Sequence, residues 1–283
     1  MTLRNGIRYW LIAFVVIYAG AWLLVPIGAQ IRQDGEAACA DRVRTLVTAM
    51  LMYLQDYDEV MPLAFGRTTD GVWLWNQYHP VPADWNANQL QYREAYASMW
   101  ANALSIYLPV RGPGVASRYD WLLCPSVRLQ RLGNYTGVQK RPASVSYTYN
   151  GLLHRLEVGR VAAPHLVPLL WEGRGRDATY GYALSNPVLR CTSVSNCQYR
   201  PYTGGECSPR GVMFGLLGSA WIHPRGVAFA FVDGHVAYRR LGLVVGANTN
   251  YNYDPFTNYD SNGIPQSHWT DGCNPWLFRP YTQ

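Results

Sequence analysis

A single uncharged stretch near the start of the chain constrains what the rest can fold into. Residues 9–29 read YWLIAFVVIYAGAWLLVPIGA and contain no charged side chain. An apolar helix of about 20 residues is long enough to cross a bilayer. Arg4 and Arg8 precede the stretch, and basic residues favour the cytoplasmic side of a membrane. We therefore expect 1–8 to be a cytoplasmic or leader segment and 9–29 to be a transmembrane helix, with the rest of the chain outside the cytoplasmic membrane.

A cleaved signal peptide is the alternative interpretation of the same stretch. Its apolar region would be shorter, and a small-x-small cleavage site would follow it. Gly28-Ala29-Gln30 matches such a site poorly, so the sequence favours a retained span.

The helical pattern continues beyond the apolar stretch. Over 30–60, apolar residues recur at i, i+3, i+4, i+7, i+8 and i+11, which places them on one face of a helix. Asp56-Tyr57-Asp58-Glu59 and then Pro62 should end this helix. We expect one helix from about residue 7 to residue 57, apolar all round at first, kinked at Pro26, and amphipathic afterwards. The apolar face consists of Val43, Leu46, Val47, Met50, Leu51 and Leu54.

The composition argues against two classes of function. Charged residues make up 15% of the chain, and the net charge is +6. Lys140 is the only lysine, and the arginines are scattered without a basic run, so we expect no nucleic-acid partner. No serine, cysteine or acidic pair stands in a pattern typical of nucleophilic or acid–base catalysis, and no glycine-rich phosphate loop is present. We therefore expect no enzymatic activity.

Six cysteines are spread along the part of the chain that we expect outside the membrane. None forms a CxxC pair or stands near a histidine at zinc-finger spacing. An even number of dispersed cysteines in an oxidising compartment predicts disulfides, although the sequence alone leaves the pairing open. The six are Cys39, Cys124, Cys191, Cys197, Cys207 and Cys273.

A second helix and several strands are predicted further along. The helix begins near Asn88, a candidate N-cap, and should end at Pro109. Its apolar and aromatic residues are expected to face the core; they are Tyr92, Tyr96, Met99, Trp100, Ala103, Leu104 and Tyr107. The strand candidates are Val145–Tyr149, Leu166–Trp171, Val227–Val232 and His235–Leu241.

The last two strand candidates flank Asp233-Gly234. A two-residue Asp-Gly link between strands predicts a hairpin with a type I′ turn, because that turn needs a positive φ at both positions.

Several motifs in order along the chain carry a resemblance to a known family. AACADRV at 37–43 leads into LMYLQDYDE at 51–59, and His223 is followed after nine residues by Asp233-Gly234. Two shorter matches are LCPS at 123–126 and SYTYN at 146–150. In these segments the chain resembles the type IV pilin and pseudopilin superfamily, in particular the bacterial prepilin-like group with an H-x9-DG C-terminal domain.

The resemblance implies an α+β, pilin-like fold. A long N-terminal helix would pack on the antiparallel β-sheet of a disulfide-containing head at 61–241, and a Gly/Asn/Tyr-rich tail at 242–283 lies beyond the resemblance. The implied function is a structural subunit of an extracellular filament, assembled with copies of itself through the apolar N-terminal helix. Its other partners would be the membrane before assembly and the secretion or pilus assembly machinery, and its final place the cell surface.

The resemblance also implies one disulfide. Cys39 and Cys124 stand at the two positions where this group often has cysteines, so these two are expected to pair. The other pairs, suggested by spacing alone, are Cys191 with Cys197 and Cys207 with Cys273.

One departure from the family keeps an alternative open. Pilins carry a glutamate at the fifth position of the mature chain. If Gly6 ends a leader and Ile7 begins the mature chain, that position is Leu11. The alternative is a non-polymerising, pseudopilin-like membrane-anchored protein that serves secretion or binds an envelope ligand.

The residues of the H-x9-DG motif allow two interpretations. His223, Asp233 and His235 are residue types that bind metals or take part in catalysis. The structural interpretation, which we favour, places Asp233 and Gly234 in the hairpin turn and lets His223 hydrogen-bond the backbone or cap that turn.

Two short patterns suggest further sites. Asp254, Asp260 and Asn262 offer oxygen ligands at short spacing for calcium. The distal glutamate of an EF-hand is missing, and these residues are also ordinary turn formers. Apart from calcium, we expect no cofactor. Asn134 begins the N-glycosylation sequon Asn134-Tyr135-Thr136.

Overall fold

The computed structural model describes most of the head and part of the first helix. The described residues are 35–74, 78–112, 115–131, 135–172, 177–189, 197–200, 212–213, 223, 227–239, 257–259, 265–268 and 278–281. The chain divides into two units, 1–38 and 39–283, and nearly all described residues belong to the second unit. The expected membrane segment 9–29 and the expected kink at Pro26 lie outside these ranges.

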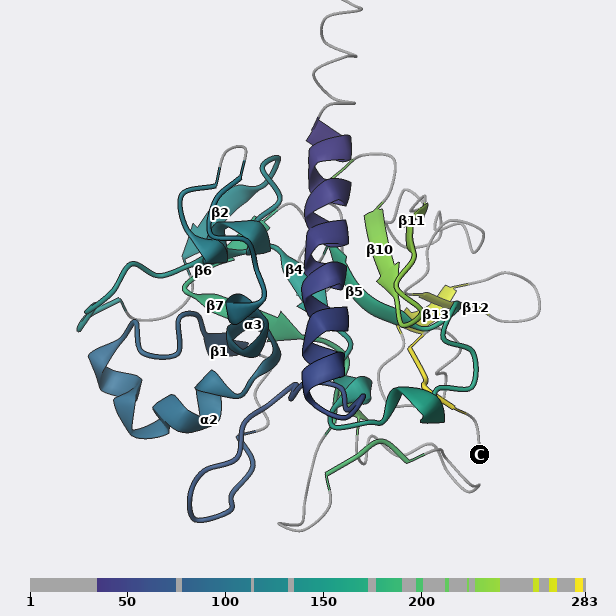
Figure 1. Cartoon of the computed structure of the whole chain (residues 1–283), viewed down its shortest axis with the longest axis horizontal. Helices are drawn as coiled ribbons and strands as arrows, with labels where there is room; N and C mark the ends of the chain where they lie inside the picture. The colour runs from purple at the N-terminus through teal and green to yellow at the C-terminus, as the bar shows by residue number, and fades with distance from the viewer. Residues whose placement is uncertain are drawn as a thin grey trace, which may run out of the picture. The chain divides into compact units, whose positions relative to one another are not determined.

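A helix over 35–56 is the longest element of the described chain (Figure 1). It ends where the sequence predicted, and two consecutive residues with positive φ follow it: Asp58 at 51° and Glu59 at 58°. Residues other than glycine rarely adopt a positive φ, and a right-handed helix requires a negative φ. The helix therefore cannot continue through these two residues. Among the helices of the described ranges, none combines the length and the apolar character that crossing a membrane requires.

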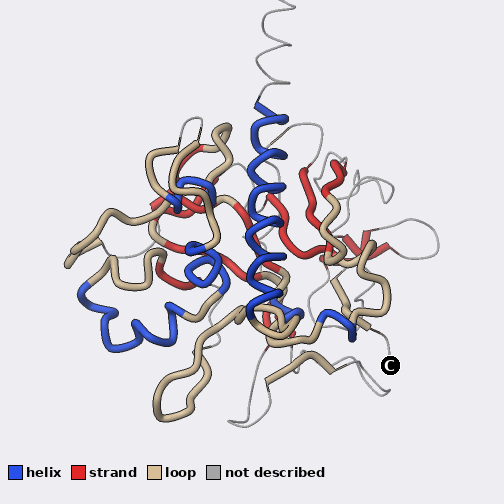
Figure 2. Tube along the Cα trace, in the orientation of Figure 1, coloured by secondary structure: helices blue, strands red, loops and turns tan. Residues whose placement is uncertain are grey.

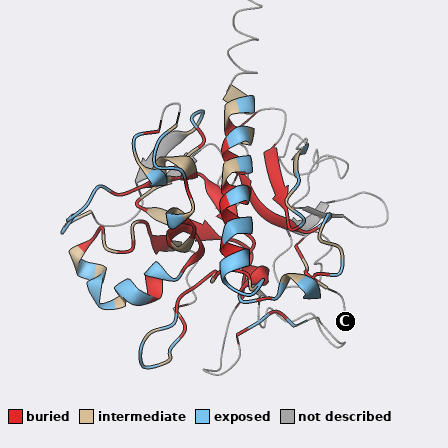
Figure 3. Ribbon diagram, viewed as in Figure 1, coloured by how far each residue is buried: buried red, intermediate tan, exposed pale blue. Residues whose placement is uncertain are grey.

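The helix buries one face and exposes the other (Figure 3). Of the predicted apolar face, Val43, Leu46, Val47, Met50 and Leu54 are buried. Leu51 is 42% exposed, which corrects the prediction for this residue. It lies at the margin of the buried face, next to the turn at Gly234: a Cβ at Gly234 would lie 3.4 Å from Leu51 Cδ1.

A six-stranded sheet forms the centre of the head, in the order β1-β7-β4-β5-β10-β11. Its strands are β1 (Tyr78–Pro80), β7 (Tyr182–Ser185), β4 (Tyr147–Tyr149), β5 (Pro168–Glu172), β10 (Val227–Phe231) and β11 (Val236–Arg239). The described part of the chain therefore combines helices with a β-sheet, an α+β arrangement.

The sheet is mixed rather than wholly antiparallel. Strands β4 and β7 run parallel, whereas the other neighbouring pairs are antiparallel. Parallel neighbours need a crossover connection of a dozen or more residues. The chain between Tyr149 and Tyr182 provides this connection. It forms β5 and then β6 (Asp177–Tyr180) before β7 pairs with β4.

The predicted strand at 145–149 is divided between two sheets. Its first part is β3 (Ser144–Val145), which pairs with β6, and its second part is β4. Ser146 stands between them: its N–H donates to Leu122 O at 2.8 Å, and its Oγ accepts from Cys124 N at 2.6 Å. Hydrogen bonds to a neighbouring segment therefore replace the sheet ladder at this residue.

Small sheets and short helical turns complete the head (Figure 2). The remaining strands are β2 (Arg128–Arg131), paired with β6, β8 (Val188–Leu189), paired with β9 (Val212–Met213), and β12 (Thr257–Tyr259), paired with β13 (Pro265–His268). The 3-10 turns away from the second helical region are η3 (Arg118–Leu122), η4 (Gly151–Leu153) and η5 (Val158–Arg160).

The predicted second helix is broken into short pieces. These are η1 (Ala87–Tyr92), α2 (Arg93–Ala97), α3 (Trp100–Ala103) and η2 (Leu104–Ile106). The N-cap is Asn86 rather than Asn88, because the Asn86 side chain accepts from the Asn88 N–H. The break falls at Met99, which is extended and bridges Leu63.

The hairpin of β10 and β11 is present, but its turn differs from the prediction. Phe231 pairs with His235 through Phe231 N and His235 O at 3.0 Å, which leaves a three-residue loop of Val232, Asp233 and Gly234. Only Gly234 has a positive φ, at 91°. A three-residue loop of this kind needs glycine at its last position only, so the two-residue type I′ turn is wrong.

The end of the chain returns to the sheet. Phe278 is fully buried, and its ring lies 5.0 Å from that of Trp171 on β5. Asn150 Nδ2 donates to Phe278 O at 2.9 Å and to Pro168 O at 2.8 Å. The described end of the tail thus belongs to the core of the head.

A buried cysteine, glutamate and histidine cluster as the candidate functional site

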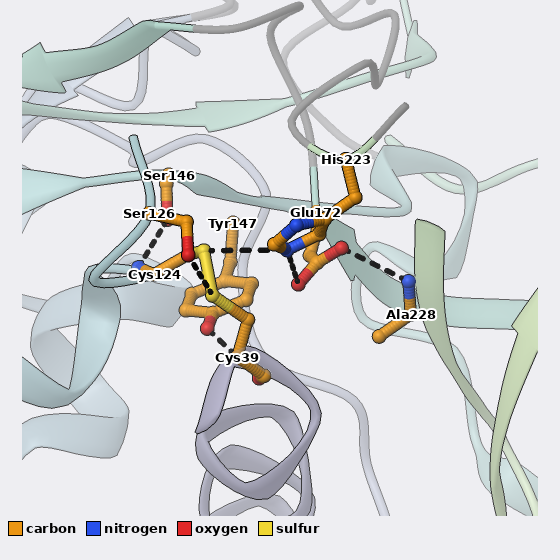
Figure 4. Close-up of polar contacts among 8 residues, drawn as sticks. All are labelled: Cys39, Cys124, Ser126, Ser146, Tyr147, Glu172, His223 and Ala228. Atoms are coloured by element: carbon orange, nitrogen blue, oxygen red, sulfur yellow. Dashed lines mark hydrogen bonds and ion pairs between the residues drawn. A yellow bond between two sulfur atoms is a disulfide. The ribbon is translucent and has the colours of Figure 1, made fainter. Parts of the chain in front are cut away.

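A disulfide between Cys39 and Cys124 ties the first helix to the head (Figure 4). It is the pairing that the resemblance implied, and both residues are fully buried. Cys197 is disulfide-bonded as well. Cys191, Cys207 and Cys273 lie outside the described residues, so their pairings stay predictions.

Further contacts fix the helix around Cys39. Arg42 Nη1 donates to Leu123 O at 2.8 Å and also to Asp120 O, so one guanidinium satisfies carbonyls at the end of η3. The same guanidinium lies 5.8 Å from the ring centre of Trp121. On the other side, Tyr147 Oη donates to Cys39 O at 3.1 Å. The helix is therefore positioned by polar contacts as well as by its apolar face.

Glu172 brings a carboxylate to the disulfide from the end of β5. The residue is fully buried, and its Oε2 accepts from Ala228 N at 3.0 Å. Its Oε1 has no hydrogen bond but lies 3.4 Å from His223 Nε2. Burying a carboxylate is costly unless it is paired, so this residue calls for an explanation.

His223 completes the cluster. It is 6% exposed, and its Nε2 lies 3.4 Å from Glu172 Oε1 and 3.7 Å from Cys124 Sγ. Figure 4 shows the imidazole between the disulfide and the carboxylate. We refer to Cys39, Cys124, Glu172 and His223 as the Cys–Glu–His cluster; one ligand-type atom from each of the four lies within 4.8 Å of the others.

The structure separates the H-x9-DG residues into two groups. Asp233 Oδ1 accepts from His235 N at 3.1 Å and lies 2.6 Å from His235 Nδ1, both at the hairpin turn. The described contacts of the His223 ring are with Cys124 and Glu172, and the expectation that His223 caps the turn or hydrogen-bonds the backbone stays a prediction. Partial burial acts to raise the pKa of Asp233, but hydrogen bonds and charge from His235 outweigh it and lower the pKa.

The charge of Glu172 affects the pKa of the neighbouring Tyr147. Burial raises the pKa of this phenol well above its ordinary value, and the negative charge of Glu172 adds to the effect, whereas the positive charge of Arg42 opposes it. Tyr147 is therefore protonated at neutral pH and can donate its hydrogen bond to Cys39 O.

Sequence reasoning found three members of the cluster and missed Glu172. The cysteines came from the resemblance and His223 from its motif, but Glu172 ends an apolar strand, PLLWE. A carboxylate that directly follows four apolar residues of a buried strand is unusual, and this pattern could have marked Glu172 as a candidate site residue. The other candidates, Asp254, Asp260, Asn262 and Asn134, lie outside the described residues.

A surface cavity of about 730 Å³ lies beside the end of the first helix. Tyr53 and Tyr57 line it together with Asp84, Arg93 and Lys140. Asp84 Oδ2 lies 2.6 Å from Lys140 Nζ and 3.7 Å from Arg93 Nη2. The hydrogen bond from Lys140 is the main cause of the lowered pKa of Asp84. The cationic groups are thus already paired within the lining.

Comparison with known proteins adds no family assignment. No protein-family model matches the chain, and no curated protein and no solved structure matches it significantly.

Proposed function

We propose that this protein is a structural subunit of an extracellular pilus-like filament, assembled through its apolar N-terminal helix. The observation that carries the proposal is the helix over 39–56. One face is buried in the head, and a disulfide locks it there. The opposite face is left exposed. In a filament, we expect such a helix to follow the uncharged segment 9–29 and to carry the folded head.

The exposed face of the helix offers a surface for neighbouring subunits. Its residues recur at spacings of three and four; they are Ala37, Asp41, Arg44, Thr48, Leu51 and Gln55. Met52 beside them is 45% exposed. Packing of the apolar segment 9–29 among its copies would keep it out of water once it has left the membrane, and exposure of that segment to water would cost about 25 cal/mol for each Å². Before assembly, the same segment would hold the protein in the cytoplasmic membrane.

The test is microscopy of material sheared from cells that make the protein. Negative staining should show filaments, and mass spectrometry should find this chain in them. The N-terminal peptide should begin at Met1 or, after leader removal, at Ile7. If the sheared fraction holds no filaments and the protein stays with the membrane, the polymer is excluded and the membrane-anchored pseudopilin-like alternative replaces it.

A matched pair of variants tests the exposed helix face. Met52→Arg places a charge on this face and should reduce the amount of filament while the head keeps its thermal stability. Val110→Arg changes an apolar side chain that is 56% exposed and is not part of the helix, and it should leave filaments unaffected. Equal filament yields from the two variants would exclude this face as a subunit contact.

A further inference from the structure

We propose that the Cys–Glu–His cluster is a zinc site in the dithiol form of the protein. When the Cys39–Cys124 disulfide is reduced, the two sulfurs, one Glu172 oxygen and the His223 ring nitrogen bind one zinc ion. The disulfide and the metal then exclude each other at the same four side chains. This inference does not depend on filament assembly.

The spacing of the ligand atoms fits tetrahedral zinc. Zinc binds nitrogen and oxygen at about 2.0–2.1 Å and sulfur at about 2.3 Å, so neighbouring ligand atoms lie about 3.3–3.8 Å apart. His223 Nε2 is 3.4 Å from Glu172 Oε1 and 3.7 Å from Cys124 Sγ. All four ligand atoms lie within 4.8 Å of one another. After cleavage of the S–S bond the two sulfurs must move apart, and any ligand pair near the 4.8 Å limit must close to the tetrahedral spacing.

The hydrogen bonds around the cluster leave one carboxylate oxygen available to a cation. Glu172 Oε2 is held by Ala228 N at 3.0 Å, whereas Oε1 has no hydrogen bond although the residue is fully buried. A second-shell hydrogen bond of this kind orients a ligating carboxylate. The backbone of Cys124 is fixed in the same way, because its N–H donates to Ser146 Oγ at 2.6 Å.

The donor set selects zinc over calcium and magnesium. Two thiolates and an imidazole suit zinc, whereas calcium and magnesium prefer oxygen ligands. Two thiolates and one carboxylate carry three negative charges against the two positive charges of the ion. The neighbouring guanidinium of Arg42, which donates to Leu123 O at 2.8 Å, is a cation near Cys39 that favours the remaining negative charge.

The redox step balances with a dithiol reductant. The reductant gives two electrons and two protons to the S–S bond, which yields two thiols, and the reductant becomes a disulfide. Zinc then replaces the two thiol protons, which pass to solvent. In the reverse direction, a disulfide oxidant takes two electrons from the thiolates and releases the ion.

The test compares cobalt and zinc binding by the reduced and oxidised full-length protein. The protein is reduced with a phosphine, freed of reductant without oxygen, and titrated with Co²⁺, whose thiolate complexes absorb strongly in the near ultraviolet. We expect one Co²⁺ for each reduced chain, displaced by Zn²⁺, and none for the disulfide form. Equal binding by the two forms would overturn the proposal.

Variants assign the ligands and exclude the other cysteines. Cys39→Ala/Cys124→Ala should abolish the absorption band, and Glu172→Gln, which still accepts from Ala228 N, should weaken binding about 10–100-fold. His235→Gln, at the hairpin turn, is the matched control and should bind as the wild type does. A band that persists in the double variant would place the metal elsewhere and overturn the proposal.

Near-ultraviolet circular dichroism, recorded during the same titration, shows whether the chain loses its tertiary structure on reduction. If the reduced chain unfolds without metal, zinc should refold it, because the free energy of metal binding then contributes to folding. A reduced chain that neither binds the ion nor refolds with it would also overturn the proposal.

Discussion

Two buried histidines are held neutral by the interior of the head. His79, on β1, is fully buried, and neither of its ring nitrogens has a hydrogen bond. Burial lowers its pKa to about 3. The ring of His154 stacks on Phe65 at 4.0 Å, and its Nδ1 accepts from Ala64 N at 3.0 Å. Burial, and then the charge of Arg155, lower the pKa of His154 well below its usual value.

These histidines predict a loss of stability in mild acid. Both have a folded-state pKa below the unfolded value of about 6.5, so below that pH the unfolded chain binds more protons than the folded one. The free energy of unfolding should be nearly constant in this respect above about pH 6.5 and fall as the pH drops toward 3. Each histidine contributes a slope of about 1.4 kcal/mol for each pH unit. Urea unfolding at a series of pH values measures the slope.

A variant pair isolates the contribution of His79. His79→Gln should remove about one proton from the slope, because glutamine does not titrate. His165→Gln changes an exposed histidine and should leave the slope nearly as it is. A slope unchanged by His79→Gln would show that this side chain is already protonated, or not buried, in the folded protein.

At the scale of elements, two glycines in similar 3-10 turns have opposite surroundings. Gly151 lies in η4, where a Cβ would stand 2.2 Å from Pro187 O. Gly159 lies in η5, where a Cβ would meet nothing within 4 Å. The first glycine is therefore required by the close approach of η4 to the chain beside β8, and the second is not.

The pair Gly151→Ala and Gly159→Ala turns this difference into a prediction. Gly151→Ala forces a backbone shift and should lower the free energy of unfolding by about 2–3 kcal/mol. Gly159→Ala reduces the freedom of the unfolded chain and should be neutral or stabilise by up to about 1 kcal/mol. Urea denaturation of both variants measures the difference. Similar values for the two would contradict the packing of η4 against Pro187.

Local patterns predicted the elements whose causes are local. The end of the first helix followed from Asp58, Glu59 and Pro62, and the strands β5, β10 and β11 followed from their composition. The division of 145–149 at Ser146 did not, because it depends on hydrogen bonds to Leu122 and Cys124, which are more than twenty positions away along the chain.

Pairings between distant segments could not be predicted from local sequence patterns for the same reason. The parallel neighbours β4 and β7, the break at Met99 and the three-residue loop before His235 are set by which segments meet in the core. Of the Cys–Glu–His cluster, a sequence motif marked His223, but only the fold places it beside Glu172. Nothing in the spacing of these two residues relates them.

At the scale of the whole molecule, the first helix is attached to the head through side-chain contacts along its length. It is fixed by its buried face, by Arg42 and by the Cys39–Cys124 disulfide, which closes a loop over a sequence separation of 85 residues. Cross-linking residues so far apart restricts the unfolded chain strongly. By the chain-entropy relation, a loop of this length corresponds to about 4–5 kcal/mol.

Removal of this disulfide is therefore expected to cost more stability than most single substitutions in the core. Cys39→Ala/Cys124→Ala should lower the free energy of unfolding by about 4–5 kcal/mol if the entropic term dominates. Leu46→Ala, which truncates a fully buried side chain of the same helix, should cost about 2–5 kcal/mol through the cavity it leaves. Urea unfolding without reductant measures both variants on the same scale.

The two variants also distinguish how the helix is held. If the disulfide acts mainly on the unfolded chain, the native helix of the double variant stays docked, and trypsin should cut at exposed Arg44 no faster than global unfolding allows. If the disulfide instead holds the helix against the head in the native state, cleavage at Arg44 should accelerate more than the loss of global stability explains. If the free energy of unfolding of the double variant lies within about 1 kcal/mol of the wild-type value, the apolar face and Arg42 suffice to hold the helix. The two cysteines of the cluster would then matter for redox or metal chemistry rather than for stability.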